Sequence, residues 1–524
     1  MQQQTSSVEL THREILQVLV GLLAGMFTAL ISSTIVSNAL PTIIADLNGS
    51  QTQYTWVVTS SLLAMTVSMP IWGKLSDLVN KKTLVQIALV TFVIGSILAG
   101  AAQSVPWLIA CRVLQGLAMG GLIATSQSII GSIIPPRQRG RYSGYMGATM
   151  AVATVSGPLL GGVIVDTPGL GWRWCFYVCV PLAVMSLVVL HRQLHLPTIR
   201  RKVRLDLGGA VLITTAASLP LIWVTFAGTS FAWISTETAL FLGVTLLAAV
   251  LVVVVETRHP EPLLPIAVVR ERTTALAIVG SIAVGMSMFG GSVFLGQYFQ
   301  IAGGHSAAYA GVLSIPLMTG SLVGTVLSGQ LITRYGRWKR FLVAGSSLLV
   351  VGLAMLSTVD HTTPEWHAMT SMAVMGLGMG MLLQNYVLAV QNTVSVSTVG
   401  AASATVAFFR SFGGAVGVSV LGAILAHDVK TSVTDQLASQ GVSGPSAGSG
   451  SLLDLDALPA PVAGIVRAAY GDATGHIFAI AAVVAVVSLV AALFIKEIPL
   501  RTTIDRAPEE KADDEVDEIS VPVG

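Results

Sequence analysis

Charged residues are scarce in this chain. Only 10% of its 524 residues are Asp, Glu, Lys or Arg, whereas 53% are hydrophobic. Soluble domains carry about 25% charged residues, so a chain with this little charge cannot cover a surface that faces water. Length alone would suggest several soluble domains, but the low charge excludes that interpretation. The composition indicates that lipid is the main solvent of the chain.

Cysteine is rare as well. The three residues of this type, Cys111, Cys175 and Cys179, all lie in or beside apolar segments. A structural zinc site takes four Cys or His ligands, and no such ligands cluster near Cys175 and Cys179. We interpret all three as small apolar residues, and we predict neither a metal site nor a cofactor.

What the chain does have is long apolar runs. A helix needs about 20 apolar residues to cross ~30 Å of hydrocarbon, and only helices satisfy every backbone group along such a run in lipid. We therefore predict an all-α, polytopic membrane protein whose first run is retained, because it is too long for a signal peptide. The fourteen predicted spans are residues 15–36, 54–73, 83–102, 107–130, 142–165, 173–192, 207–227, 238–255, 274–297, 309–331, 341–359, 367–390, 402–426 and 476–496.

Positive charge alternates along the connections between these runs. Lys and Arg gather, for example, in residues 74–82, 137–141, 200–204 and 334–340, and are sparse in the intervening connections. Cytoplasmic loops carry the excess of Lys and Arg. The distribution predicts a multi-pass plasma membrane protein with both termini in the cytoplasm.

Two segments stand apart from the spans. Residues 427–475 include the Gly- and Ser-rich stretch GVSGPSAGSG, and we expect a long outside loop there. The tail 501–524 is acidic and poor in aromatic residues, so we expect a disordered cytoplasmic tail.

A weak internal repeat divides the chain. GKLSDLVNKK (73–82) and GQLITRYGRWK (329–339) both follow an even-numbered span and combine Gly-x-Leu with basic residues. Repeats of this kind indicate two homologous helical bundles. We therefore predict a six-span half at 1–193, two inserted spans at 194–272, a second six-span half at 273–500 and the tail at 501–524.

The repeated motif resembles the signature between spans two and three of the major facilitator superfamily. That resemblance implies a cytoplasmic latch that opens and closes between conformations. The family usually has Arg at the position of Leu78 and Gly at that of Asn80, and the second copy has Thr333 in place of the acid. The expected latch residues are Gly73, Leu75, Asp77, Lys81, Lys82, Gly329, Gly336 and Arg337.

Arg112, Gln115 and Gly116 resemble the fourth-span motif of the same superfamily. An arginine inside a span is expensive and marks a functional candidate. The other interpretation is an arginine near the outer end of its span that reaches water.

Gly157, Pro158, Gly161 and Gly162 resemble the fifth-span motif of exporters in this superfamily, which implies an antiporter. Residues 34–36 with 39–41, 172–174, and 391–392 with 400–424 resemble the fourteen-span drug:proton antiporters. Taken together, the resemblances cover nearly the whole chain. They imply multidrug efflux and antibiotic resistance at the cell membrane, with protons as the coupling ion.

The family's usual proton-binding acid is missing. Ser32 stands where this subfamily usually carries Asp in span one, and no Asp or Glu falls in the middle of a predicted span. Three possibilities stay open: Asp77 couples protons through the latch, a polar network around Ser32, Ser33 and Arg112 does so, or transport is not driven by protons.

We expect the binding cavity near the midplane between the halves. For each candidate taken singly, packing between helices is the other interpretation. The candidates for the cavity wall are Ser32, Thr34, Asn38, Gln127, Tyr298, Gln300, Gln384, Asn385, Phe409 and Arg410.

The leading hypothesis is a secondary exporter of small amphiphilic compounds such as drugs or toxic metabolites. The alternative is a dedicated exporter of one lipid or cell-envelope metabolite. An intramembrane enzyme would need HExxH, GxSxG or paired aspartates at membrane depth, and a channel would need a polar pore lining. A nucleotide-driven pump is excluded because the chain has no GxxxxGK[ST] loop. We expect no catalytic activity and no nucleic-acid partner, and a monomer suffices because one chain supplies both halves.

Overall fold

The computed structural model describes most of the chain. The described residues are 12–47, 51–134, 142, 145–146, 149, 152–153, 156–157, 160–161, 163–165, 167, 169–194, 206–227, 231–232, 234–259, 262–264, 266–305, 307–395, 398–439 and 460–500.

These residues are almost entirely helical, with one isolated bridge between Ala227 and Phe231. The elements are α1 (His12–Asp46), α2 (Gln51–Leu78), α3 (Lys81–Gly100), α4 (Val105–Ile133), α6 (Trp174–Tyr177), α7 (Cys179–Gln193), α8 (Leu207–Phe226), α9 (Thr236–Arg258), α10 (Ile266–Val269), α11 (Arg272–Gln297), the π-helical turn η1 (Tyr298–Ala302), α12 (Ala307–Leu313), α13 (Ile315–Tyr335), α14 (Lys339–Leu356), α15 (Glu365–Leu383), α16 (Asn385–Gln391), α17 (Val399–Ser439) and α18 (Ala460–Phe494).

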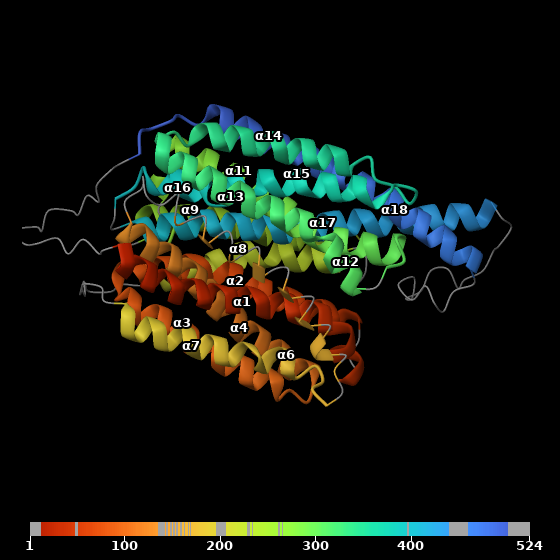
Figure 1. Cartoon of the computed structure of the whole chain (residues 1–524), viewed down its shortest axis with the longest axis horizontal. Coiled ribbons are helices and arrows are strands. Elements are labelled where there is room, and N and C mark those ends of the chain that lie inside the picture. The colour runs from red at the N-terminus through yellow and green to blue at the C-terminus, as the bar shows by residue number, and fades with distance from the viewer. Residues whose placement is uncertain are drawn as a thin grey trace, which may run out of the picture.

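The helices form two groups that lie side by side along the long axis of the molecule (Figure 1). One buried apolar core joins residues between 15 and 264 to Ala407 and Phe408 of α17. A second core joins residues between 277 and 500. The all-α prediction is confirmed for the described residues.

Both groups pack their helices in the same pairs. The pairs α2–α4, α3–α4, α3–α7 and α1–α7 in the first group match α13–α15, α14–α15, α14–α18 and α11–α18 in the second. A shared polar contact supports the match. Lys82 Nζ donates to the His191 carbonyl at the end of α7 (2.7 Å), and Lys339 Nζ donates to the Leu493 carbonyl at the end of α18 (2.8 Å).

Glycines set the distance between the paired helices. Gly116 and Gly120 of α4 lie directly on the backbone of α2, and Gly376 and Gly380 of α15 lie in the same way on α13. Lipid is as apolar as the side chains, so burial from water does not drive helices together in a bilayer, and close backbone packing takes its place. The internal symmetry therefore extends to the packing of individual glycines.

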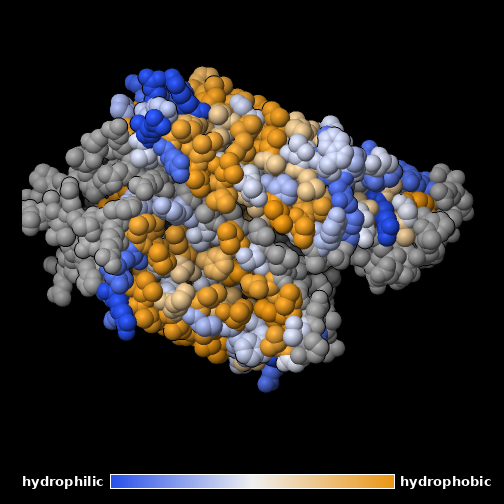
Figure 2. Space-filling view, viewed as in Figure 1, coloured by the Kyte–Doolittle hydropathy of each residue, from blue (hydrophilic) through white to orange (hydrophobic). Residues whose placement is uncertain are grey.

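An apolar belt covers the outer surface. In Figure 2 hydrophobic residues cover the middle of the molecule and hydrophilic ones gather toward its ends. Large exposed apolar side chains include Leu240, Leu246 and Leu247 of α9 and Val483 of α18. Such a surface suits lipid rather than water. The protein is therefore a multi-pass membrane protein.

Twelve helices among the described residues are long and apolar enough to cross a membrane. The two other predicted spans account for the difference from fourteen. Segment 142–165 lies in large part outside the described residues, and the apolar stretch Gly208–Val224 of α8 is shorter than the other spans. The count of fourteen is not confirmed.

The prediction of a long outside loop at 427–475 is wrong for its described parts. α17 continues to Ser439 and α18 begins at Ala460, so these helices have 41 and 35 residues and reach beyond the rest of the molecule (Figure 1). Residues 440–459 and 501–524 lie outside the described residues. The polar composition hid an apolar stripe in α17, Val429, Val433 and Leu437, which is buried at helical spacing.

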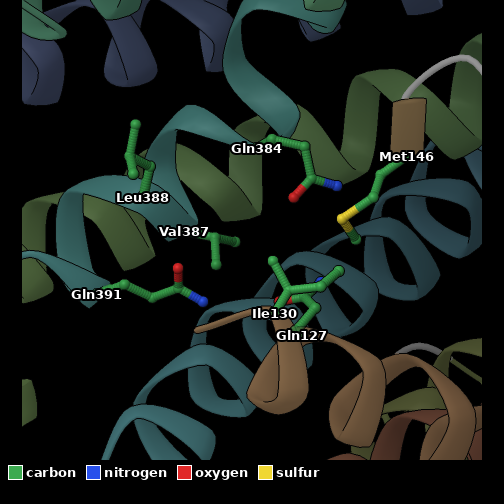
Figure 3. Close-up of a pocket in the computed structure, with 7 residues that line it drawn as sticks. All are labelled: Gln127, Ile130, Met146, Gln384, Val387, Leu388 and Gln391. Carbon is green, nitrogen blue, oxygen red and sulfur yellow. The ribbon is translucent and has the colours of Figure 1, made fainter. Parts of the chain in front are cut away.

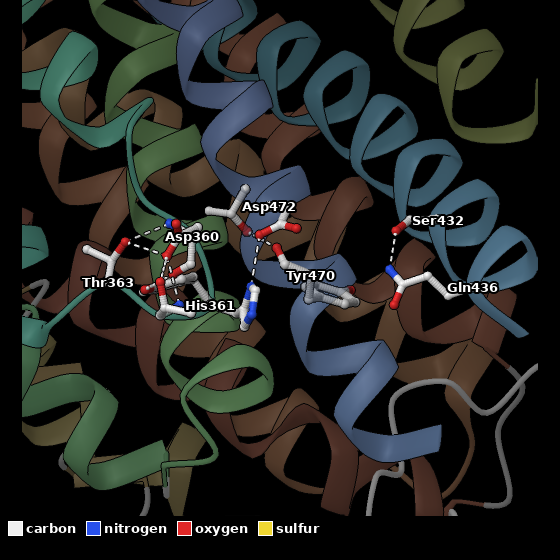
Figure 4. A network of polar contacts seen from close by, with 10 residues as sticks. Asp360, His361, Thr363, Ser432, Gln436, Tyr470 and Asp472 are labelled. Carbon is white, nitrogen blue, oxygen red and sulfur yellow. Dashed lines mark hydrogen bonds and ion pairs between the residues drawn. The ribbon is translucent and has the colours of Figure 1, made fainter. Parts of the chain in front are cut away.

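Polar contacts fasten α18 to the connection between α14 and α15 (Figure 4). His361 Nδ1 lies 3.1 Å from Asp472 Oδ1, and Gly471 of α18 packs on the His361 backbone. Beside it, the Thr362 and Thr363 hydroxyls hold the pKa of the Asp360 carboxyl below its ordinary value. These contacts thus hold α18 against the connection between α14 and α15.

Replacing Gly120 with Val should destabilise the protein, because a Cβ atom there would lie 2.5 Å from the Met65 carbonyl oxygen, a backbone atom that cannot turn away. Overpacking of this kind lowers the free energy of unfolding by about 1–3 kcal/mol. Thermal unfolding of the purified protein measures the effect. Gly243→Val is the matched control, since no atom lies within 4 Å of its Cβ position. Equal melting temperatures for the two variants would contradict this account of the packing.

Candidate functional site

The two helix groups meet where α2 and α17 cross. Ser411 Oγ lies 3.8 Å from Met69 Sδ, and about one turn further along α2 the Gly73 backbone lies against Ala404. A Cβ atom on Gly73 would overlap the Ala404 side chain. The absence of a side chain at residue 73 therefore permits this contact.

Asp77 completes the junction. Its carboxylate accepts hydrogen bonds from the backbone N–H groups of Gly400 (3.0 Å) and Ala401 (2.8 Å) in the first turn of α17. The first N–H groups of a helix have no partner within the helix, and the helix dipole favours an anion there. The α2–α17 latch, which we define as Gly73, Asp77, Gly400 and Ala401, thus joins a carboxylate to a helix end.

The neighbouring basic residues bind other helices. Lys81 Nζ donates to Ser128 Oγ of α4 at 2.9 Å, and Lys82 Nζ donates to the His191 carbonyl of α7 at 2.7 Å. The Asn80 side chain caps α3 by accepting from the Lys82 N–H at 2.9 Å. The sequence indicated a latch between the acid and its basic neighbours. In the structure the hydrogen bonds of Asp77 go instead to α17, a partner that the motif itself does not contain.

The second copy of the motif acts within its own half. Gly336 ends α13 with φ 70°, and Arg337 is exposed. The second copy has Thr333 in place of the acid, and Glu497, which follows α18, provides a carboxylate instead. Its Oε1 accepts from the Lys339 N–H at 3.2 Å. Sequence analysis missed Glu497, because the motif gives no signal for a residue more than 150 positions away.

A small pocket lies between residues of the two halves (Figure 3). Its cavity measures about 10 Å³, room for about one water molecule. The structure is therefore closed around this site. The lining residues are Gln127, Ile130, Met146, Gln384, Val387, Leu388 and Gln391.

Two glutamines in the pocket carry unpaired polar atoms. Gln127 Oε1 and Gln384 Nε2 are buried and make no hydrogen bond to any described residue, whereas Gln391 donates to Ser403 Oγ at 2.8 Å. A buried polar atom without a partner costs about 1–3 kcal/mol. Both amides can therefore pair with a ligand or with water.

Arg112 is held inside the first group of helices. It is 3% exposed, and its guanidinium donates to Gln115 Oε1 (3.0 Å) and to the Val57 carbonyl (3.4 Å). Gln115 in turn donates to Ser96 Oγ at 2.9 Å, so the chain of bonds links α4 to α2 and α3. The buried position excludes an arginine that reaches water.

Arg410 of α17 is buried beside the pocket. Its guanidinium donates to the Leu383 carbonyl at 3.0 Å, one residue before Gln384. Neither Arg410 nor Arg112 forms an ion pair with a described residue. The interior thus holds two cationic side chains that no described carboxylate neutralises.

The fifth-span motif is described only in part. Gly157 packs on Thr34 of α1, whose hydroxyl lies 3.4 Å from the Ala153 carbonyl, and Gly161 is buried. Pro158 and Gly162 lie outside the described residues, as does the side chain of Asn38.

Other predicted cavity residues lie elsewhere. Tyr298 donates to the Asp360 carbonyl at 2.9 Å, and Gln300 is exposed, so this π-helical turn serves the end of the molecule opposite the latch. Asn385 binds within the second group, donating to Ser328 Oγ at 3.2 Å. Phe409 packs on the first apolar core, and Ser32 is buried beside Cys179.

Solved structures share this arrangement of helices. A human organic anion transporter, MFSD10, superposes with a TM-score of 0.57 at 13% identity, over 91% of this chain and 100% of its own. A proton:xylose symporter, XylE, superposes with a TM-score of 0.58 at 14% identity, over 93% of this chain and 97% of its own. At these identities the likeness shows the fold alone.

Sequence relatives are much closer. An uncharacterized MFS-type transporter of Mycobacterium tuberculosis is 34% identical over 93% of this chain and 70% of its own length. The multidrug transporter protein MdtP of Bacillus subtilis is 32% identical over 80% of this chain and 76% of its own. Multidrug resistance protein 3 of the same organism is 29% identical over 93% and 96%.

The model of the Major Facilitator Superfamily family matches residues 22–418, which is most of the chain. This range includes the latch, the pocket and both buried arginines. The protein belongs to the Major Facilitator Superfamily and is a multi-pass membrane transporter.

Proposed function

We propose that the protein exports small amphiphilic compounds from the cell by alternating access, coupled to protons. The observation that carries the proposal is the α2–α17 latch, which closes one end of the molecule beside a pocket with unpaired amide groups. The fifth-span glycines resemble those of exporters, and the Bacillus relatives are named as multidrug proteins.

The latch suits a reversible gate. Opening this end breaks the two hydrogen bonds of Asp77 and separates a glycine contact, and of the first apolar core only Ala407 and Phe408 belong to α17. The Lys and Arg distribution assigns this end to the cytoplasm. The structure then represents a conformation closed to the cytoplasm, and both termini lie on that side of the plasma membrane.

The proposal extends to the topology. Residues 1–193 and 273–500 form the two six-span halves, and α8 and α9 within 194–272 are the inserted pair. With segment 142–165 and α8 as spans, the chain has the fourteen of the drug:proton antiporter subfamily. The repeated helix pairs and glycine contacts support this division.

Asp77 is the proposed proton-coupling residue. Ser32 replaces the usual span-one acid, and the pocket lining contains no carboxylate. Proton coupling requires a carboxylate whose hydrogen-bond partners change between conformations. In this proposal Asp77 accepts from Gly400 and Ala401 in the closed latch and loses both partners when the latch opens. Protonation removes its charge and so favours opening.

The cargo is a neutral or anionic amphiphile. No described residue of the pocket lining would neutralise a cation, and Arg410 lies beside the pocket without an ion pair to any described residue. The second candidate is a dedicated exporter of one anionic lipid or cell-envelope metabolite. The helices α17 and α18 that extend beyond the bundle favour it, because they can guide a single bulky product away from the membrane.

Asp77→Asn should weaken the latch, because the amide nitrogen cannot accept from an N–H group and the charge is lost. Spin labels on Val79 and Thr398, at the described ends of the junction, should report a larger population of long distances than in the wild type. Glu497→Gln is the matched control, since it alters a similar helix cap within one half. An unchanged distance distribution in Asp77→Asn would show that the latch does not hold the halves together.

The purified protein in liposomes should move several unrelated amphiphilic dyes when a pH gradient is imposed. Protein-free liposomes and a collapsed gradient are the controls. Movement of no dye under either sign of the gradient would reject multidrug export and favour the dedicated exporter. Full gradient-driven movement by Asp77→Asn would exclude Asp77 as the coupling residue.

Arg410→Gln should reduce transport of an anionic dye by about tenfold or more, because one hydrogen bond to a charged group contributes about 1.5–3 kcal/mol. Transport of a neutral dye of similar size should change little. Arg410→Lys keeps the charge and should retain part of the anion transport. Equal losses for both dyes would mean that Arg410 acts only in packing.

A further inference from the structure

Two carboxylates that the transport proposal does not use meet where α8 begins and α9 ends. Asp206 directly precedes α8 and is 6% exposed, and Glu256 in the last turn of α9 is 2% exposed. The two helices pack against each other in opposite directions, which brings these ends together. The pair lies outside the pocket described above.

Each carboxylate has one satisfied and one unsatisfied oxygen. Asp206 Oδ1 accepts from the Gly209 N–H at 2.7 Å, and Glu256 Oε2 accepts from the Leu264 N–H at 3.0 Å. Asp206 Oδ2 and Glu256 Oε1 are buried and make no hydrogen bond to any described residue. Such atoms are rare in folded proteins and require an explanation.

The two unsatisfied oxygens point into the same space. Both lie within 2.6 Å of the position that a Cβ atom on Gly209 would occupy. Glycine at this position leaves the space empty, so the two oxygens face each other across it. Any other residue at 209 would collide with both.

Among the described residues, no Lys or Arg forms an ion pair with either carboxylate. The charged groups that act on Glu256 are Asp206 and His259, and Arg258 beside it is exposed. Neither carboxylate forms an ion pair with a described residue. The basic residues that precede Asp206 in the chain lie outside the described part.

Two ionised carboxylates that are buried beside the same space would repel each other. One proton removes the repulsion, and it supplies the donor that both bare oxygens lack, as in carboxyl pairs that share a proton. A sodium or calcium ion would need about six oxygen ligands, and the site offers two. A proton is therefore the ligand that fits.

We propose that Asp206 and Glu256 form a proton-binding site, in which one shared proton fastens the start of α8 to the end of α9. The proton forms an O–H bond on one carboxyl group and a hydrogen bond to the other, and the pair then carries a single negative charge. This inference does not depend on the direction or substrate of transport.

The sign of the pH dependence follows from the geometry. The proton stabilises the junction while it is bound, and its loss at higher pH leaves two buried charges beside the same space. The stability of the protein should therefore fall once the pH is high enough to remove the shared proton. At lower pH the junction stays intact, because the shared proton remains in place.

Asp206→Asn is the sharpest test. Asparagine caps a helix as well as aspartate does, so α8 keeps its cap, and the amide supplies Glu256 with a permanent donor. The melting temperature of the wild type should fall between about pH 6 and about pH 9, whereas that of Asp206→Asn should fall much less. Glu237→Gln, an exposed carboxylate at the other end of α9, is the matched control and should behave like the wild type.

Infrared spectroscopy tests the proton itself. The carbonyl band of a protonated carboxyl group should be present in the wild type and in Glu237→Gln at neutral pH, and reduced in Asp206→Asn and Glu256→Gln. A band of equal strength in all four proteins would overturn the proposal. Stabilisation of the wild type at high pH by added Na⁺ would overturn it too, because a metal ion would then be the ligand.

Discussion

The contact between Asp77 and the first turn of α17 joins the two halves of this transporter at one end. Two conditions make it possible: a glycine at 73 that lets the backbones meet, and a carboxylate that reaches N–H groups with no partner in their own helix. Neither requires deep burial of apolar surface. Apart from Ala407 and Phe408 of α17, the first apolar core lies within residues 15–264, and the second lies within 277–500.

Within each half, glycines also let the helix backbones pack closely against each other. Gly116 and Gly120 place α4 on α2, and Gly376 and Gly380 place α15 on α13. Helices in lipid gain little from burying apolar side chains against each other, so they depend on this close approach. The halves differ in where they use a carboxylate: Asp77 caps a helix of the other half, whereas Glu497 caps one of its own. One copy of the motif thus joins the two halves, and the other holds a helix end within its own half.

Charge inside the molecule is rare and each instance is specific. Arg112 is satisfied by a glutamine and a carbonyl, Arg410 by a carbonyl next to the pocket, and Asp206 and Glu256 face each other. Isolated charges are expensive in such an interior. The two arginines hydrogen-bond neighbouring helices, whereas Asp206 and Glu256 each keep one oxygen without a partner among the described residues. Gln127 and Gln384 likewise each keep one such amide atom.

The sequence by itself determined the class of the protein. Apolar runs and the scarcity of charge require membrane helices, and the motifs around Gly73, Arg112 and Gly157 identify the family, because these features are local. Only the tertiary structure decided the partner of Asp77, the pairing of Asp206 with Glu256, and the length of α17. Each depends on how helices cross and rotate, which brings together residues 50 to more than 300 positions apart, and no local pattern encodes such a meeting.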